Sequence, residues 1–206
     1  MTVGFAGFAS AATVDVYLQA QSFAKPVGAA TVPMWVFADC DATFTTCTNS
    51  APGPQIEAVA GDTLNIHVQN TLNVPVSVVI PGQAESVPGA PVMMGTGAIN
   101  DRVRSFTREA DAIDVAGPGT ATYTYVVKAG TYLYQSGTFP SIEVPMGLYG
   151  ALVVADAVAG EAYGHTVDAE AVLLLSEIDP IQNPRVVDAA TVLELPLGTA
   201  CVPMVY

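Results

Sequence analysis

The stretch from Gly130 to Val154 constrains the fold of this chain more than any other. It begins with GTYLY, whose aromatic and β-favouring residues predict a strand. It ends with LYGALVV, a nearly continuous apolar run that is typical of a strand buried on both faces. Pro140 and Pro145 lie between the two runs and cannot sit in a central strand, so we expect a long loop there.

The rest of the chain alternates between short segments of β-type pattern and turns rich in glycine and proline. Eighteen glycines and 15 prolines punctuate the 206 residues, and 51% of the residues are hydrophobic, which is enough for a large core. This composition favours an all-β sandwich of antiparallel sheets. We expect a turn at Gly61 and Asp62 to join its two flanking segments in a hairpin. The other expected strands span residues 13–21, 32–38, 55–60, 63–70, 74–80, 120–127 and 171–178.

Two blocks of the sequence resemble the plastocyanin-like domains of the multicopper oxidase family. Residues 147–154, GLYGALVV, match the family's G-L-Y-G-A-L-I-V in all but one letter. Residues 52–56, PGPQI, and 61–70, GDTLNIHVQN, match its P-G-P-x-I and G-D-x-L-x-I-x-V-x-N. The resemblance has specific motifs over residues 50–155 and extends in general pattern over 13–180. It implies an all-β Greek-key β-sandwich of the cupredoxin type.

The same resemblance predicts a degenerate copper site. The family's S-I-H-W-H-G falls on SVVIPG, which puts Val79 and Pro81 at the two histidine positions. Its G-T-Y-W-Y-H-S-H falls on GTYLYQSG, which puts Gln135 and Gly137 at the second pair. Valine, proline and glycine have no donor side chain, and glutamine is a poor ligand for copper. We therefore expect no metal or cofactor in this chain, and any copper of a full-length protein would be bound elsewhere.

The remaining candidate ligands do not predict another metal site. A blue-copper centre needs two histidines and a cysteine, whereas His67 lies in the middle of an expected strand and His165 lies in a turn. We assign Met93, Met94 and Met146 to loop and core packing. The sequence has no G-x-S-x-G motif, and no pair of carboxylates can be picked out. No catalytic residue is predicted.

The charge of the chain narrows the range of partners. The formal net charge is −13, and there are only six lysines and arginines. Nucleic acids and anionic lipids both need a basic face, so neither is expected as a partner. No segment is long and apolar enough for membrane insertion. The main basic cluster is Arg102, Arg104 and Arg108, which we expect nearby acids to balance, namely Asp101, Glu109 and Asp111.

The cysteines indicate an oxidising compartment. Cys40 and Cys47 lie in CDATFTTC, and this close spacing predicts a local disulfide. No cluster of histidines lies nearby to suggest zinc. Cys201 either pairs with a cysteine beyond this chain or remains free. We expect a secreted or periplasmic protein.

The ends of the chain indicate more than one domain. Residues 1–12 resemble the tail of a secretory signal peptide, with a short apolar arm as the alternative. We assign residues 13–156 to a cupredoxin-like domain. Residues 157–206 are interpreted as a connector and the start of a further, truncated domain.

Three functional hypotheses remain open. The first is a plastocyanin-like domain of a secreted multicopper-oxidase-like protein that binds no copper and acts as a scaffold or interface. The second is the first domain of a multicopper oxidase whose copper ligands lie in downstream domains, and the third is a stand-alone binding module. Because an apolar patch without a metal is best covered by protein, we expect a contact near Val79, Pro81, Tyr134 and Phe139. Its partner would be a downstream cupredoxin domain or a neighbour in a homo-oligomer.

Overall fold

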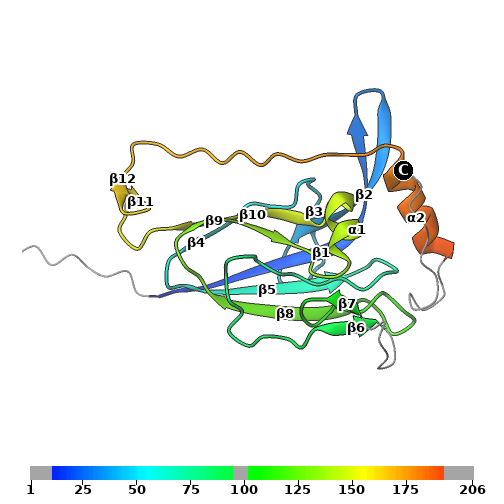
Figure 1. The fold of residues 1–206 in the computed structure, drawn as a ribbon, viewed down its shortest axis with the longest axis horizontal. Coiled ribbons are helices and arrows are strands. Elements are labelled where there is room, and N and C mark those ends of the chain that lie inside the picture. The colour runs from blue at the N-terminus through cyan, green and yellow to red at the C-terminus, as the bar shows by residue number, and fades with distance from the viewer. Residues whose placement is uncertain (1–10, 95–101, 193–206) are drawn as a thin grey trace, which may run out of the picture.

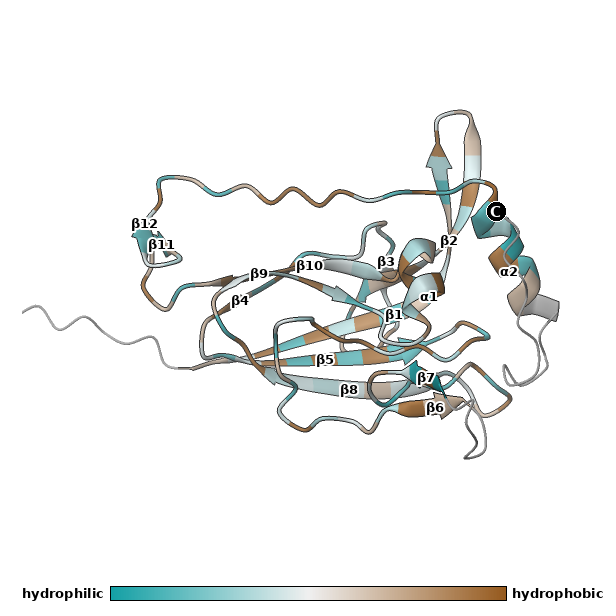
Figure 2. Ribbon diagram, in the orientation of Figure 1, coloured by the Kyte–Doolittle hydropathy of each residue, from teal (hydrophilic) through white to brown (hydrophobic). Residues whose placement is uncertain are grey.

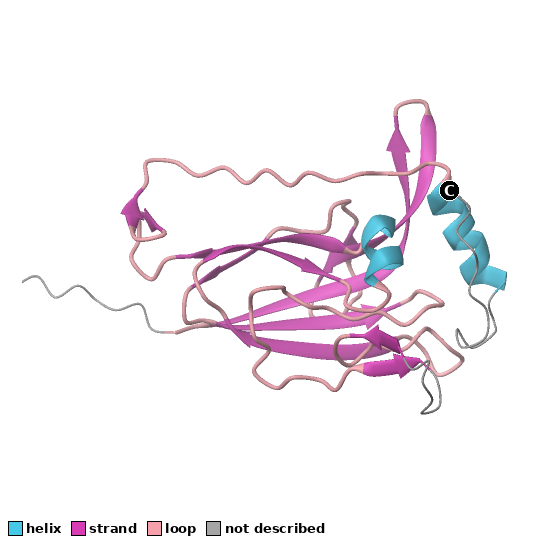
Figure 3. Cartoon of the chain, in the orientation of Figure 1, coloured by secondary structure: helices cyan, strands magenta, loops and turns pink. Residues whose placement is uncertain are grey.

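Strands dominate residues 11–94 and 102–192, the part of the chain that this computed structural model describes (Figure 3). The all-β prediction is therefore confirmed. Among these residues, the larger sheet has the order β3–β2–β1–β5–β8 and the smaller one β4–β10–β9, while β6–β7 and β11–β12 form separate pairs (Figure 1). The elements are β1 (Thr13–Val27), β2 (Ala30–Cys40), β3 (Cys47–Thr48), β4 (Ile56–Val59), β5 (Thr63–Asn70), β6 (Val92–Met94), β7 (Arg102–Ser105), β8 (Gly119–Val126), β9 (Gly130–Gln135), α1 (Pro140–Met146), β10 (Tyr149–Ala155), β11 (Glu161–Ala162), β12 (His165–Thr166) and α2 (Gln182–Val192).

The larger sheet is built around β1. This strand pairs antiparallel with β2 and parallel with β5, which in turn pairs antiparallel with β8. The strand continues to Val27 because its residues stay paired with β2, and the turn comes only at Gly28, whose φ of 60° suits glycine. The hairpin of β1 and β2 therefore reaches beyond the neighbouring strands (Figure 1).

The smaller sheet is built around β10. This strand pairs parallel with β4 and antiparallel with β9, and most of its residues are buried, as the apolar run predicted. The predicted hairpin of residues 55–70 is wrong, because β4 and β5 belong to different sheets. The turn between them crosses from one sheet to the other. The Asp62 carboxylate fixes this crossing by accepting hydrogen bonds from the amides of Val59 and Ala12 at 2.9 and 2.8 Å.

Three further predictions need correction. The loop between β9 and β10 contains the short helix α1, which starts at Pro140, where a missing amide hydrogen costs nothing. Residues 74–80 form no strand, and only Val76 and Val79 make isolated bridges. Residues 171–178 are not paired in a strand, and the chain instead runs extended from β12 to α2 (Figure 1).

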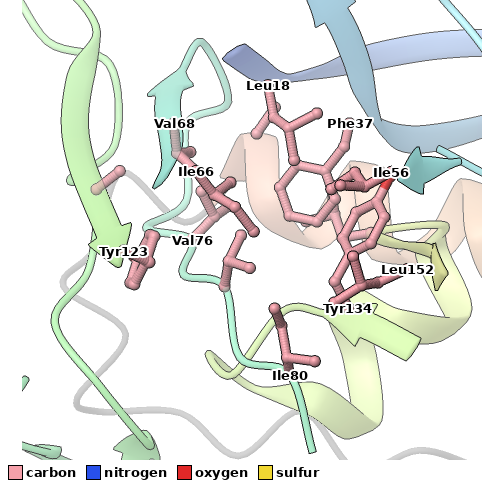
Figure 4. Close-up of a cluster of buried hydrophobic side chains, with 14 of the residues drawn as sticks. Leu18, Phe37, Ile56, Ile66, Val68, Val76, Ile80, Tyr123, Tyr134 and Leu152 are labelled. Carbon is pink, nitrogen blue, oxygen red and sulfur yellow. The ribbon is translucent and has the colours of Figure 1, made fainter. Parts of the chain in front are cut away.

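The core lies between the two main sheets. Along β5 every second residue is buried, so Leu64, Ile66 and Val68 face inward, and the alternation is visible in Figure 2. Phe37 of the larger sheet and Tyr134 of the smaller one meet with ring centroids 6.0 Å apart (Figure 4). Figure 4 also shows the core side chains of Leu18 and Tyr123 from the larger sheet, of Ile56 and Leu152 from the smaller one, and of Val76 and Ile80 from the loop after β5.

Helix α2 packs against β2 and adds Ala190 to the core. The Asn73 side-chain amide donates to the carbonyl of Ala190 at 2.7 Å and fastens the helix to the loop after β5. None of the described helices is long and apolar enough to cross a membrane. Residues 1–10 of the signal-peptide assignment and Cys201 lie outside the described residues, and the proposed division at residue 156 remains a prediction.

Candidate functional site

The two segments expected to match the copper-ligand strands lie side by side. The Val79 amide donates to the Gln135 carbonyl at 2.9 Å, and the Gln135 amide donates back to Val79 at 3.0 Å. This bridge joins the loop after β5 to the end of β9. Three of the four predicted positions, Val79, Gln135 and Gly137, therefore meet at one place, with Pro81 exposed just beyond them.

Gly137 has no room for a side chain. A Cβ atom there would lie 2.8 Å from Val79 Cγ1 and 3.0 Å from Ser77 Oγ. Contacts of this length force a neighbour to move. The branched side chain of Val79 and the hydroxyl of Ser77 thus occupy the space next to Gly137, and a larger residue does not fit beside them.

A buried network of hydroxyl groups surrounds this point. Ser77 Oγ accepts from the Gly137 amide at 3.1 Å and shares hydrogen bonds of 3.0 Å with the hydroxyls of Ser105 and Thr138. Thr138 Oγ1 also lies 3.0 Å from Glu109 Oε1. Polar groups so deeply buried are stable only when they satisfy one another, which they do here. The network holds the loop after β9 against the rest of the sandwich.

The network ends at an ion pair. Arg104 donates to both carboxylate oxygens of Glu109, at 2.5 and 3.2 Å. A bidentate guanidinium–carboxylate pair is stronger and more directional than a single contact. The predicted balance of Arg104 by Glu109 is confirmed, whereas Arg108 pairs with Glu85. Asp101 lies outside the described residues.

Glu143 of α1 is a buried acid next to this network. Its Oε2 lies 2.5 Å from the hydroxyl of Ser136, and its Oε1 has no hydrogen-bond partner among the described residues. Ser136 Oγ also accepts from the Thr138 amide and lies 3.2 Å from the Thr138 carbonyl, which can only accept. Since a hydroxyl has one hydrogen, the arrangement is satisfied when Ser136 donates to that carbonyl and Glu143 donates to Ser136. Burial raises the pKa of Glu143 well above its usual value, which agrees with a protonated carboxyl group.

Comparison with known proteins shows which proteins this chain resembles. The model of the multicopper oxidase family matches residues 31–102. L-ascorbate oxidase of Nicotiana tabacum is 37% identical over 128 residues, which are 61% of this chain and 19% of that enzyme. The chain thus spans about a fifth of that relative's length. A multi-copper oxidase from Pseudomonas thermotolerans superposes with a TM-score of 0.56 at 20% identity, over 73% of this chain and 31% of that one, and shows the same fold.

The chain has a cupredoxin-like fold, and its residues 31–102 match the multicopper oxidase family. The predicted cupredoxin sandwich is confirmed. The residues at the positions matched to the family's copper ligands do not fit a copper centre, because Val79, Pro81 and Gly137 offer no donor atom from a side chain. Within residues 11–94 and 102–192, no three His, Cys, Asp or Glu side chains are grouped so that they could hold a metal ion.

The expected contact residues of the cupredoxin-like domain differ in exposure. Tyr134 is fully buried and donates its hydroxyl to the Pro54 carbonyl at 2.7 Å, so it belongs to the core and offers no surface to a partner. Val79 and Phe139 are half-buried, and Pro81 is exposed. Phe139 precedes α1 with a φ of 37°, and its amide donates to the Arg104 carbonyl at 2.9 Å. Whether Val79, Pro81 and Phe139 contact a partner stays a prediction.

A surface pocket that sequence reasoning missed lies beside Val79. It holds about 350 Å³ and is lined by residues of the 79–89 loop, by Phe106 and Thr107, and by Tyr125 of β8. The Glu85 carboxylate in its wall accepts from Thr107 Oγ1 at 3.1 Å and pairs with Arg108. The pocket has no sequence signature, because its walls come from three separate parts of the chain.

His67 lies on the outer face of the larger sheet, away from the matched ligand positions. Its Nε2 is 3.0 Å from Asp15 Oδ1, its Nδ1 is 3.1 Å from Thr122 Oγ1, and Tyr17 stacks on the ring at 4.7 Å. The hydrogen bond from His67 holds the pKa of Asp15 below its usual range. These residues sit on the neighbouring strands β1, β5 and β8. Their contacts with His67 therefore stabilise the pairing of the three strands.

The other candidate residues lie in separate parts of the fold. His165 is exposed in β12, and Met146 is buried in the core, as expected from packing. Met93 is exposed in β6. Cys40 and Cys47 form a disulfide that closes the loop between β2 and β3.

Proposed function

We propose that this cupredoxin-like domain is a structural part of a multicopper-oxidase-like protein and supplies no copper ligand at the four matched positions. One observation carries the proposal. Val79 and Gly137, at two of the positions that the motifs assign to histidines, lie side by side, and the space beside Gly137 is filled by the Val79 and Ser77 side chains. A histidine at Gly137 would need the surrounding segment to be rebuilt.

The hydroxyl network supports the same proposal. Copper requires imidazole, thiolate or thioether donors. Here the corresponding region contains Ser77, Ser105 and Thr138, whose hydroxyls are already engaged with one another and with Glu109. These groups stabilise the loop after β9 in a fixed position, which suits a scaffold.

The proposed role of the domain is to form contacts. Pro81 is exposed and Val79 and Phe139 are half-buried at the end of the sandwich where the matched strands meet. Apolar side chains gathered at such a place favour cover by a neighbouring domain or subunit. The acidic charge and the Cys40–Cys47 disulfide support a secreted or periplasmic protein.

A second function is favoured by the ascorbate oxidase similarity. At 37% identity over 128 residues, the domain could serve an oxidase whose copper ligands all lie in other domains. Its role would then be to pack against the copper-bearing part, and the residues of this chain would still hold no metal. The two candidates differ in what surrounds the domain.

Metal analysis of the protein isolated from its natural source separates the two. Copper together with oxidation of ascorbate in the isolated protein would support the oxidase. Absence of both supports a purely structural role. Copper bound by residues of this domain itself would contradict both candidates.

A further inference from the structure

We propose that the domain associates with a second copy of itself through the surface formed by Pro81, Val87, Pro88 and Phe106, which we term the Phe106 face. This inference deepens the proposed function, because it rests on the domain acting through contacts and names the partner. The Phe106 face surrounds the pocket of about 350 Å³ next to Val79.

The first argument is the exposure of large apolar side chains at one place. Phe106 is 58% exposed and Val87 is 70% exposed, and both Pro81 and Pro88 are exposed. Phe106 and Pro88 line the same pocket. Contiguous apolar surface of this kind on a soluble chain marks a contact site.

The second argument is that the Phe106 face is held in shape by the fold. Arg108 Nη1 donates to the Val87 carbonyl at 3.0 Å, and a Cβ at Gly89 would lie only 2.5 Å from Thr107 Oγ1. The Phe106 amide donates to the Gly137 carbonyl at 3.1 Å. The loop after Pro81 and the segment after β7 are therefore fixed against each other, so the contact needs little ordering on association.

The third argument is self-complementarity. A two-fold contact presents the same patch from both copies, so a patch must fit itself. On the Phe106 face, a 58% exposed aromatic ring forms part of the wall of a pocket that Ile80, Pro81 and Tyr125 also line. In a two-fold pair, Phe106 of each copy can enter the pocket of the other, which buries both rings.

The fourth argument is charge. Two chains with a net charge of −13 repel each other over most of their surface. Three of the six basic residues of the chain are close to Phe106 in the sequence, namely Arg102, Arg104 and Arg108. Arg108 pairs with Glu85, and Arg104 pairs with Glu109. The charges around the Phe106 face thus balance locally, and two copies can meet there with little repulsion.

The molar mass of the full 206-residue chain as a function of concentration tests the proposal. Light scattering or sedimentation equilibrium between about 5 µM and about 500 µM should show a rise from the monomer mass towards the dimer mass. Added NaCl should increase the dimer fraction, because salt screens the repulsion between two acidic chains. A chain that remains monomeric over this range overturns the proposal.

Two variants locate the contact. Phe106→Asp should weaken the dimer by about tenfold or more, since it removes the anchoring ring and adds a charge to the contact. Pro81→Asp, on the pocket rim, gives an independent test should Phe106→Asp fail to fold. Val158→Asp is the matched control, because Val158 is 56% exposed and lies between β10 and β11, far from β7 in Figure 1.

The outcomes separate this proposal from the proposed function. A dimer that survives both Phe106→Asp and Pro81→Asp, or that is lost equally in Val158→Asp, contradicts a contact at the Phe106 face. Circular dichroism of each variant shows whether the fold is kept. None of these results bears on copper, so the structural role of the domain is judged separately by its metal content.

Discussion

Val79 and Gln135 exchange both of their backbone hydrogen bonds, at 2.9 and 3.0 Å, although 55 residues of chain separate them. Both residues stand at positions that the multicopper oxidase motifs assign to copper-binding histidines. The two segments therefore lie side by side, and Val79 offers no side-chain donor atom for copper.

Gly137→Ala should destabilise the domain by about 1–3 kcal/mol, because the added methyl group would meet Val79 Cγ1 at 2.8 Å. The free energy of unfolding in urea measures the effect. Val79→Ala removes the atoms that clash, so the double variant should lose less than the sum of the two single variants. Purely additive effects would show that the two side chains do not compete for this space.

Glu143 should make the domain less stable as pH rises from mildly acidic values. Its pKa in the folded state is raised by burial, so its contribution is fully present below the ordinary value near 4.5 and is lost as pH rises through the raised value. Glu143→Gln, which stays neutral, should flatten this dependence as pH rises above about 5, where one titrating group changes stability by up to about 1.4 kcal/mol per pH unit.

The exposed Glu57 provides the control for this experiment. Glu57→Gln removes a carboxylate that is hydrogen-bonded to Gln55 at the surface and should leave the slope unchanged. Equal slopes in the wild type and in Glu143→Gln would mean that Glu143 is already ionised in the folded protein.

Replacing Cys40 and Cys47 by serine should cost about 2–3 kcal/mol, the value expected for closing so short a loop in the unfolded chain. The loop itself should keep its shape, because the Asp41 carboxylate accepts hydrogen bonds from the amides of Thr43, Thr45 and Thr46. Thermal unfolding with and without reductant measures the cost, and peptide mapping without reduction should find the two cysteines linked. Unchanged stability after reduction would contradict this assignment.

The sequence predicted the strands with clear periodicity well and their partners less well. The alternation of residues 63–70 and the apolar run of 148–154 correspond to β5 and β10. The turn at Gly61 and Asp62 was also present, yet it joins two different sheets. A turn signal is local, whereas the choice of β10 as the partner of β4 depends on contacts between residues about 95 positions apart, such as Ala58 with Val154.

The hydroxyl network at the candidate site could not be predicted from the sequence. Ser77, Ser105 and Thr138 are common polar residues in separate segments, and no motif relates them. They meet because the bridge between Val79 and Gln135 aligns the loop after β5 with the loop after β9. In contrast, the lack of a side-chain copper donor at Val79, Pro81 and Gly137 follows from residue types alone, and the degenerate copper site at these positions and Gln135 stays a prediction.

The copper content of this chain tests the central claim most directly. The chain would be produced in copper-supplemented medium, dialysed, and analysed by inductively coupled plasma mass spectrometry together with its protein concentration. We predict far less than one copper ion per chain, because the matched positions carry no set of copper donors and Val79 and Ser77 fill the space beside Gly137. One or more tightly held copper ions per chain after dialysis would contradict the account.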